Sequence, residues 1–335
     1  MSSRIRLSDV ARHAKVSTAT VSRVVNDRPG VAKDKRRAVL AALDVLGYER
    51  PTESAPLSSG LIGLIVPELS NPVFPLYAQE IEQVLSTEGY MPLLCTQSPG
   101  GITEDEYVRT LLDRHVAGII FVSGLHADSA ADPERYTNLA DTPFVTINGP
   151  NPEVSAPSFS CDDEDATARA FDHLVTLGHT RIGLAVGPQR FIPTQRKVAG
   201  FTAAHQRAGL NTEPHISSSL YTMEGGQAAA AELLRAGCTA IICASDMMAM
   251  GAVRQVRQLG LRVPDDISIV GYDDTPLIAY TDPPLTTIRQ PVGRIARAAA
   301  GTLIQMIDGR TTSAASLVFA PELVVRASTG VLTPS

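Results

Sequence analysis

Cysteine is scarce in this sequence of 335 residues. The four cysteines, Cys95, Cys161, Cys238 and Cys243, are far apart, and no Cys-x-x-Cys pair occurs. Structural zinc sites and dithiol redox centres use closely spaced cysteines, so this spacing favours neither. We expect four buried structural thiols in a protein of a reducing compartment, and no metal.

Segments that direct a chain to a membrane are also missing. The N-terminus has no charged region followed by an apolar stretch of signal-peptide type. No uninterrupted apolar run reaches the roughly 20 residues that a membrane-spanning helix needs. We therefore expect a cytoplasmic protein with no membrane partner.

The motifs of common catalytic sites are absent as well. The sequence has no GxGxxG after an expected strand, no P-loop, no HExxH and no G-x-S-x-G elbow, and its seven histidines are scattered. The acidic run at 162–165 could be taken for a metal cluster. It lies at an expected strand-to-helix transition, where carboxylates interact favourably with the helix N-terminus, and this second interpretation is favoured. We expect no enzyme activity, no catalytic residue and no cofactor.

Charge is divided unevenly along the chain. Residues 1–50 carry eleven Lys and Arg against five Asp and Glu, a net charge of +6, whereas the rest carries 18 against 30, a net charge of −12. The length suggests two or three structural units, and a hydrophobic fraction of 44% is ample for sizeable cores. A basic head on an acidic body is typical of a small DNA-binding module attached to something else.

The basic head has the pattern of a helix-turn-helix. Two short amphipathic helices are expected, the first capped by Ser8 and the second by Ser17, because serine hydroxyls accept orphan N–H groups at helix starts. A third helix is expected from about 31 to 46, with its apolar stripe on Val39, Leu40, Leu43 and Leu46. In the second helix Val16, Val21, Val24 and Val25 turn inward and leave an outer face of Thr18, Ala19, Ser22, Arg23 and Asn26. Such a helix can enter the DNA major groove.

After a Pro- and Ser-containing linker at 49–60, strand-like runs alternate with helical stretches. The expected strands cover 61–67, 91–96, 117–123, 144–148, 159–162, 182–187, 240–245 and 267–272. Repeated β-α units predict parallel sheets with helices on both faces, and their length predicts two similar α/β lobes. We expect a headpiece at 1–48, the linker, and a core at 61–335. Lobe 1 of this core would cover about 61–158 and 292–320, and lobe 2 about 159–291 and 321–330.

An ordered set of motifs spans almost the whole chain. It includes Leu-Ser-Asp-Val-Ala at 7–11, Thr-Val-Ser-Arg-Val-Val-Asn at 20–26, Ile-Gly-Leu-Ile-Val-Pro at 62–67, Leu-Gly-His at 177–179, Val-Gly-Tyr-Asp-Asp at 270–274 and Pro-Leu-Thr-Thr-Ile at 284–288. In this order the motifs resemble the LacI/GalR family of bacterial transcription regulators. The resemblance implies a homodimer whose headpieces bind a pseudo-palindromic operator. It also implies a periplasmic-binding-protein-like core that holds a small effector between its lobes.

The resemblance assigns roles in the headpiece. Thr18 and Ala19 would contact bases, and Ala19 could make only an apolar contact, for example with a thymine methyl group. Arg23 would reach a base edge or else be a solvated charge. Contacts to the DNA backbone would come from Ser8, Ser17, Thr20, Ser22 and Asn26. Leu57 matches the leucine that a family hinge helix inserts into the minor groove. Pro56 disfavours such a helix, so the linker is either this hinge or a flexible tether with an exposed Leu57.

The resemblance also implies an effector site. Asp273 would accept from two vicinal sugar hydroxyls, or else serve as an ion-pair partner or helix cap, and Phe74, Tyr77 and Tyr221 would stack on a sugar ring or simply pack in the core. Lys197 stands where the family has Arg, with Arg196 beside it, so either could face the ligand. The full set is Asn71, Val73, Phe74, Tyr77, Asn148, Arg196, Lys197, Tyr221, Ser245, Asp246, Asp273 and Gln290.

Details at 47–51, 96–101, 123–128 and 195–197 are similar to the maltose/maltodextrin repressors of actinobacteria. We therefore expect a repressor whose operator affinity falls when a sugar, in this case an α-glucoside, changes the closure of the lobes. Two alternatives stay open. One is a regulator with a non-sugar co-repressor such as a purine, and the other is a cytoplasmic sugar-binding protein without regulatory output.

Overall fold

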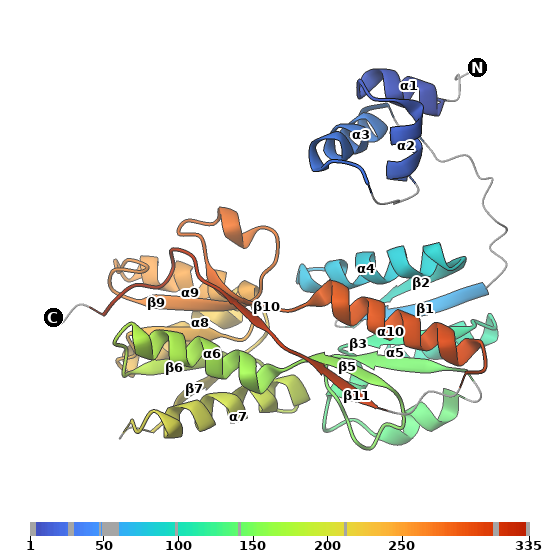
Figure 1. Cartoon of the computed structure of the whole chain (residues 1–335). Coiled ribbons are helices and arrows are strands. Elements are labelled where there is room, and N and C mark those ends of the chain that lie inside the picture. The colour runs from blue at the N-terminus through green and yellow to red at the C-terminus, as the bar shows by residue number, and fades with distance from the viewer. Residues whose placement is uncertain are drawn as a thin grey trace. The chain divides into compact units, whose positions relative to one another are not determined.

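The computed structural model describes residues 5–25, 30–46, 48, 60–97, 100–139, 142–210, 213–310 and 315–332 (Figure 1). The chain divides into two units, Met1–Pro56 and Leu57–Ser335. Within the described part, no helix is long and apolar enough to cross a membrane.

The first unit contains the three expected helices, α1 (Leu7–His13), α2 (Thr18–Val25) and α3 (Lys33–Leu46). Their buried side chains form a small core of Val10, Ala11, Val21, Val24, Val39 and Ala42. Ser17 caps α2 as predicted, since its Oγ accepts from the Thr20 amide at 3.2 Å.

Two local predictions for this unit are wrong. Ser8 does not cap α1, because the helix begins at Leu7 and the cap position is Arg6, whose amide donates to the Asp9 carboxylate at 2.9 Å. Leu40 is 52% exposed and does not belong to the buried stripe of α3, where Ala42 takes its place between Val39 and Leu43.

In the first lobe of the core, six parallel strands lie in the order β11-β5-β4-β3-β1-β2. Buried residues of helices α4 (Val73–Thr87) and α10 (Val292–Ile307) pack on one face of this sheet, and those of α5 (Glu104–Asp113) pack on the other. Two short 3-10 helices, η1 (Leu125–Ala127) and η2 (Pro133–Leu139), follow β3. The strands are β1 (Gly60–Val66), β2 (Tyr90–Thr96), β3 (Gly118–Val122), β4 (Phe144–Ile147), β5 (Ser158–Cys161) and β11 (Ser316–Phe319).

The second lobe repeats this plan with the strand order β12-β10-β9-β8-β6-β7, in which only β12 is antiparallel. Its helices are α6 (Asp163–Thr176), α7 (Ile192–Arg207), α8 (Met223–Arg235), α9 (Asp246–Gln258) and the 3-10 helix η3 (Ile278–Tyr280). The strands are β6 (Ile182–Val186), β7 (His215–Ser218), β8 (Ala240–Cys243), β9 (Ser268–Asp273), β10 (Thr286–Arg289) and β12 (Glu322–Val324).

The chain crosses between the lobes three times, after β5, β10 and β11, and Figure 1 shows these segments running from one lobe to the other. All eight expected strands exist, with bounds within a residue or two. The strand expected at 159–162 was predicted to belong to lobe 2, but it pairs in the first sheet as β5. Strands β7, β10, β11 and β12 were not predicted. The four cysteines are buried free thiols, as expected.

Candidate functional site

A cavity of about 420 Å³ lies between the two lobes. Most of its lining residues follow the carboxyl ends of parallel strands from both sheets, which is where open α/β sheets bind their ligands. The first lobe contributes Pro67, Glu68, Asn71, Val73, Phe74, Ser123, Ala127 and Asn148. The second lobe contributes Asp163, Pro188, Arg190, Phe191, Pro193, Lys197, Leu220, Tyr221, Thr222, Ala244, Ser245, Tyr272 and Asp273, and Gln290 lies on the second crossing.

Nine of the twelve expected effector residues come together around this cavity. Ser245 also caps α9, because its Oγ accepts from the Met248 amide at 3.2 Å. The nine are Asn71, Val73, Phe74, Asn148, Lys197, Tyr221, Ser245, Asp273 and Gln290. Their role in binding an effector stays a prediction.

The other three expected residues do not line the cavity. Tyr77 is fully buried and its hydroxyl donates to Gln290 Oε1 at 3.1 Å, so it holds a lining side chain and offers no ring face to a sugar. Arg196 points to the acidic start of α6, with Asp162 Oδ1 at 3.5 Å. Between the two basic candidates, Lys197 is therefore the one that faces the cavity.

Asp246, the third of these residues, is fully buried behind the cavity. One carboxylate oxygen accepts from the Thr275 amide at 2.8 Å and from its hydroxyl at 3.0 Å, and the other accepts from the Thr287 hydroxyl at 2.7 Å. Burial raises the pKa of Asp246 to about 6, although these hydrogen bonds act in the opposite direction. This carboxyl group fixes the loop that follows β9 and does not contact the cavity.

Lys197 and Asp163 form a buried ion pair on the wall of the cavity. The Tyr272 hydroxyl donates to Asp163 Oδ1, the same oxygen that Lys197 binds, at 2.7 Å, and the Lys197 ammonium lies 4.0 Å from the centre of the Tyr272 ring. Burial acts to lower the pKa of Lys197, but the charge and hydrogen bond of Asp163, together with the nearby Tyr221 and Asp273, raise it further, so the net direction of the pKa shift is upward. The wall therefore presents a fixed cation, carboxylate and phenol to the cavity.

Asp273 is the most unusual group of the site. Its φ of 116° lies in a region that residues other than glycine rarely adopt, and such strain is frequent at binding sites. Gln290 Nε2 donates to Asp273 Oδ1 at 2.6 Å, but no donor among the described residues reaches the buried Oδ2. Burial, together with the nearby Asp246, raises the pKa of Asp273 well above its usual range. An unpartnered buried oxygen in a cavity wall suits a hydrogen-bond donor from a ligand.

Part of the lining was not predicted from the sequence, above all Asp163, Tyr272, Arg190 and Phe191. The acidic run at 162–165 was interpreted as a helix start, and Asp162 does cap α6, accepting from the Asp165 amide at 3.2 Å. Asp163 and Tyr272 lie at the ends of β5 and β9, so counting every polar residue at a strand end would have found them.

The expected DNA-reading face is exposed on the first unit. Thr18, Ala19 and Arg23 of α2 are exposed, Thr20 and Ser22 are partly buried, and Ser8 and Ser17 lie at the surface near the helix starts. Ser17 and Thr20 also contact each other through their hydroxyl oxygens at 2.9 Å. Asn26 and Leu57 lie outside the described residues.

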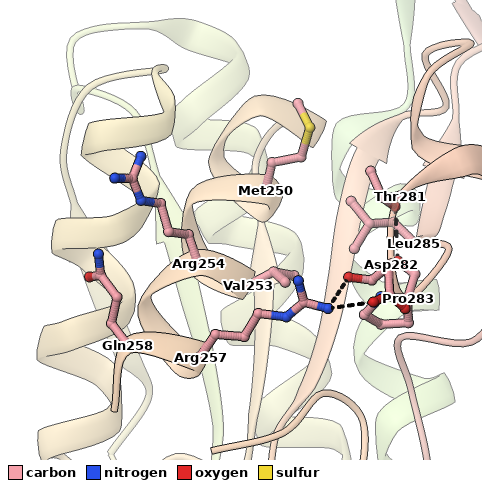
Figure 2. A pocket seen from close by; sticks show the side chains of 9 residues that line it. All are labelled: Met250, Val253, Arg254, Arg257, Gln258, Thr281, Asp282, Pro283 and Leu285. Atoms are coloured by element: carbon pink, nitrogen blue, oxygen red, sulfur yellow. Dashed lines mark hydrogen bonds and ion pairs between the residues drawn. The ribbon is translucent and has the colours of Figure 1, made fainter. Parts of the chain in front are cut away.

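A second cavity, of about 500 Å³, lies on the second lobe between α9 and the segment at 281–285 (Figure 2). Arg257 bridges its two sides, binding the Asp282 carboxylate at 3.0 Å and the Asp282 carbonyl oxygen. Met250 and Val253 line it, and Leu277 and Tyr280 in the adjoining segment are 65% and 87% exposed. The exposed side chains of Leu277 and Tyr280 form a small apolar surface beside this cavity.

Comparisons with known proteins agree with both units. Residues 6–51 match the model of bacterial regulatory proteins of the lacI family, and residues 171–329 match a periplasmic binding protein-like domain. The transcriptional regulator MalR of Streptomyces coelicolor is 57% identical over 97% of this chain and 96% of its own length. The chain belongs to the LacI family. It is a transcriptional regulator of the helix-turn-helix type.

More distant members of the family have the same architecture. The repressor CytR of Escherichia coli is 33% identical over 97% of this chain and 96% of its own length. A structure of the regulator CelR in complex with cellobiose matches with a TM-score of 0.73 at 30% identity, covering 97% of this chain and all of that one. The lac repressor dimer bound to operator matches with a TM-score of 0.70 at 27% identity over 98% of this chain and all of that one.

Proposed function

We propose that this LacI-family protein is a repressor that releases its operator when an α-glucoside of the maltose or maltodextrin type binds between the lobes. The observation that carries the proposal is the unpartnered Asp273 oxygen, buried in a cavity where nine expected effector residues come together. A vicinal diol can donate to this oxygen, and such donors favour the ionised form of Asp273, whose charge-assisted hydrogen bonds are about twice as strong as neutral ones.

The remaining lining residues also suit a sugar. Asn71, Asn148 and Ser245 supply donors and acceptors, and the Lys197–Asp163 pair offers charges of both signs. Phe74, Phe191 and Tyr221 provide apolar surface for a pyranose ring. A cavity lined by aromatic side chains and a few fixed polar groups is typical of small-molecule sites. The structure of CelR, a relative of the same fold, holds the disaccharide cellobiose.

Operator binding would use two copies of the chain. The helix-turn-helix recognises half a pseudo-palindrome, so a homodimer is needed to recognise both halves. The exposed Leu277 and Tyr280, in the segment that adjoins the α9 cavity, are our candidate for the contact between the copies. The lac repressor structure, which matches this chain over nearly its whole length, is that of a dimer on its operator.

In this mechanism the effector binds residues of both lobes and so favours one degree of lobe closure. The closure alters the contact between the two copies, and the two headpieces no longer fit their half-sites together. The coupling is reciprocal, so operator DNA weakens effector binding by the same factor by which the effector weakens operator binding.

Thermal unfolding with maltose, maltotriose and a panel of other sugars and purines tests the effector. A ligand at 100 times its dissociation constant should add about 2.7 kcal/mol to the free energy of unfolding. A gel-shift titration with operator DNA then shows whether the same ligand releases the protein. Stabilisation by a purine or a non-glucoside alone would contradict the proposal, as would a glucoside that binds without changing operator affinity.

A further inference from the structure

The lobes are joined along one edge of their sheets. The crossings follow β5, β10 and β11, and these strands and β12 are the outermost pairs, β11-β5 in one sheet and β12-β10 in the other. β3 is the fourth strand from this edge of the first sheet, and β6 is the fifth strand of the second. The segments that follow β3 and β6 therefore lie away from the covalent connections, where the lobes can separate.

These two segments bind each other directly. Asp128 Oδ2 lies 2.9 Å from Arg190 Nε, and Asp128 forms an isolated antiparallel β-bridge with Phe191. The Ser129 amide and hydroxyl both donate to the Arg190 carbonyl oxygen, at 2.8 and 2.7 Å, and Gln195 Nε2 donates to Ser129 Oγ at 3.0 Å. We call these five residues, Asp128 and Ser129 from the first lobe and Arg190, Phe191 and Gln195 from the second, the interlobe clasp.

The clasp and the effector cavity share one wall. Arg190 and Phe191 line the cavity, whereas Asp128 and Ser129 do not. The Arg190 guanidinium also lies 4.8 Å from the centre of the Phe191 ring, so the pair is held as one surface. The first-lobe half of the clasp can therefore be altered without removing a side chain that lines the cavity.

We propose that Asp128 and Ser129 are positioning residues for the effector. They hold Arg190 and Phe191 across the cavity and hold the lobes in the arrangement that binds ligand. The ligand must contact both lobes, so it binds only molecules whose lobes are closed. Its apparent affinity therefore falls when the fraction of closed molecules falls. The proposal rests on the proposed function for the identity of the ligand, but the clasp itself can be tested without any ligand.

The variants are Asp128→Asn, Ser129→Ala and the double variant. Asp128 Oδ1 accepts from the Ala130 amide at 2.9 Å, and an asparagine at this position keeps that acceptor. It removes the negative charge that forms the ion pair with Arg190. Asp172→Asn is the matched control, because Asp172 forms an ion pair of the same kind with Arg207 at 2.9 Å inside the second lobe.

Hydrogen exchange of the ligand-free protein is the first measurement. The double variant should exchange about threefold to tenfold faster in the peptides that cover 125–131 and 188–195, since it loses a partly exposed ion pair and the two hydrogen bonds of the Ser129 hydroxyl. Both peptides should change together, and the control should match the wild type. Faster exchange in 125–131 alone, or in neither, would overturn the clasp.

Maltose titration is the second measurement. We expect affinity about threefold to tenfold weaker in the double variant, mostly through faster dissociation, and unchanged in Asp172→Asn. Unchanged maltose affinity in a variant whose two peptides exchange faster would overturn the positioning role. A wild-type protein that does not bind maltose would count against the proposed function, and the exchange measurement would still decide the clasp.

Discussion

At the scale of single residues, the site depends on charges that are removed from water together. Lys197 and Asp163 are both buried, and each charge is compensated mainly by the other, while the Tyr272 hydroxyl donates to Asp163. Removing one member of such a pair leaves an uncompensated buried charge, which costs more than removing both.

Lys197→Met should therefore lower the free energy of unfolding by about 3–5 kcal/mol, and Lys197→Met with Asp163→Leu should recover most of the loss. Urea unfolding of the single and double variants measures both values. A single variant as stable as the wild type would show that water compensates Asp163 and that the pair is not desolvated.

Asp246 predicts a pH dependence of stability. Its pKa of about 6 in the folded protein is above the unfolded value, so the folded state binds the proton more tightly and folding is favoured at low pH. This contribution is present below about pH 4, where the carboxyl group of the unfolded chain titrates, and is lost as the pH rises through the folded pKa. The nearby Asp273, whose pKa is also raised, adds to the effect in the same direction.

In Asp246→Asn this titration is absent. The wild-type free energy of unfolding should fall more steeply than that of the variant between about pH 4 and about pH 7, whatever constant cost the lost hydrogen bonds impose. Urea unfolding across that range measures the two slopes, with the exposed Asp172→Asn as control. Parallel curves would mean that Asp246 ionises as easily in the fold as in the unfolded chain.

Much of the cavity was predictable at this scale, because strand ends are recognisable in the sequence. The exceptions have a common cause. Tyr77 and Arg196 lie on helices, where a one-residue rotation of about 100° decides whether a side chain faces the cavity or the core. Asp246 is the first residue of α9, and it points behind the cavity while Ser245 faces it. Such directions depend on packing between elements that sequence periodicity does not resolve.

At the scale of elements, the start of α2 provides a direct test. The sequence favours a cap at both Ser8 and Ser17, but only the Ser17 hydroxyl accepts from a backbone amide in the structure. Ser17→Ala should cost about 1 kcal/mol of helix stability, whereas Ser8→Ala, at an exposed position inside α1, should cost almost nothing.

Hydrogen exchange of the α2 amides in the full chain measures this difference. Exchange about fivefold faster in Ser17→Ala and unchanged in Ser8→Ala is the expected result. Equal effects of the two substitutions would contradict the assignment of the cap.

The strands show which elements a sequence can predict. Buried parallel strands such as β3 and β8 are continuous apolar runs in the sequence. Every strand with such an apolar run was expected. β7, β11 and β12 are short edge strands with mixed polarity, and β10 begins with two buried threonines, so none has the apolar signal of a central strand. β5 was recognised as a strand but assigned to the wrong lobe, because a local sequence pattern does not reveal which other strands a strand pairs with.

At the scale of the whole molecule, the charge division assigns DNA binding to the first unit. Arg23→Ala should weaken binding to a site selected by the wild-type protein by about 1–3 kcal/mol and relax the preference at one base position. Gel-shift titration with single-base variants of that site measures both effects. Arg169→Ala is the control, since Arg169 is exposed on α6 of the acidic core. Equal binding by Arg23→Ala and the control would remove Arg23 from base recognition.

In the proposed mechanism the contact between two copies couples effector binding to DNA binding, so its loss should affect DNA binding without a change in the headpiece. Tyr280→Asp places a charge in the proposed contact surface of the exposed Leu277 and Tyr280, and loss of an aromatic anchor from an interface weakens association by about 2 kcal/mol or more. Sedimentation at several protein concentrations should then show a dissociation constant of the dimer raised about 30-fold, while Val331→Asp, at another exposed apolar side chain, leaves it unchanged.

Because two linked headpieces bind the operator far more tightly than one, the apparent operator affinity should fall as the fraction of dimer falls and recover at high protein concentration. Operator affinity lost without a change in sedimentation would place the effect of Tyr280 elsewhere.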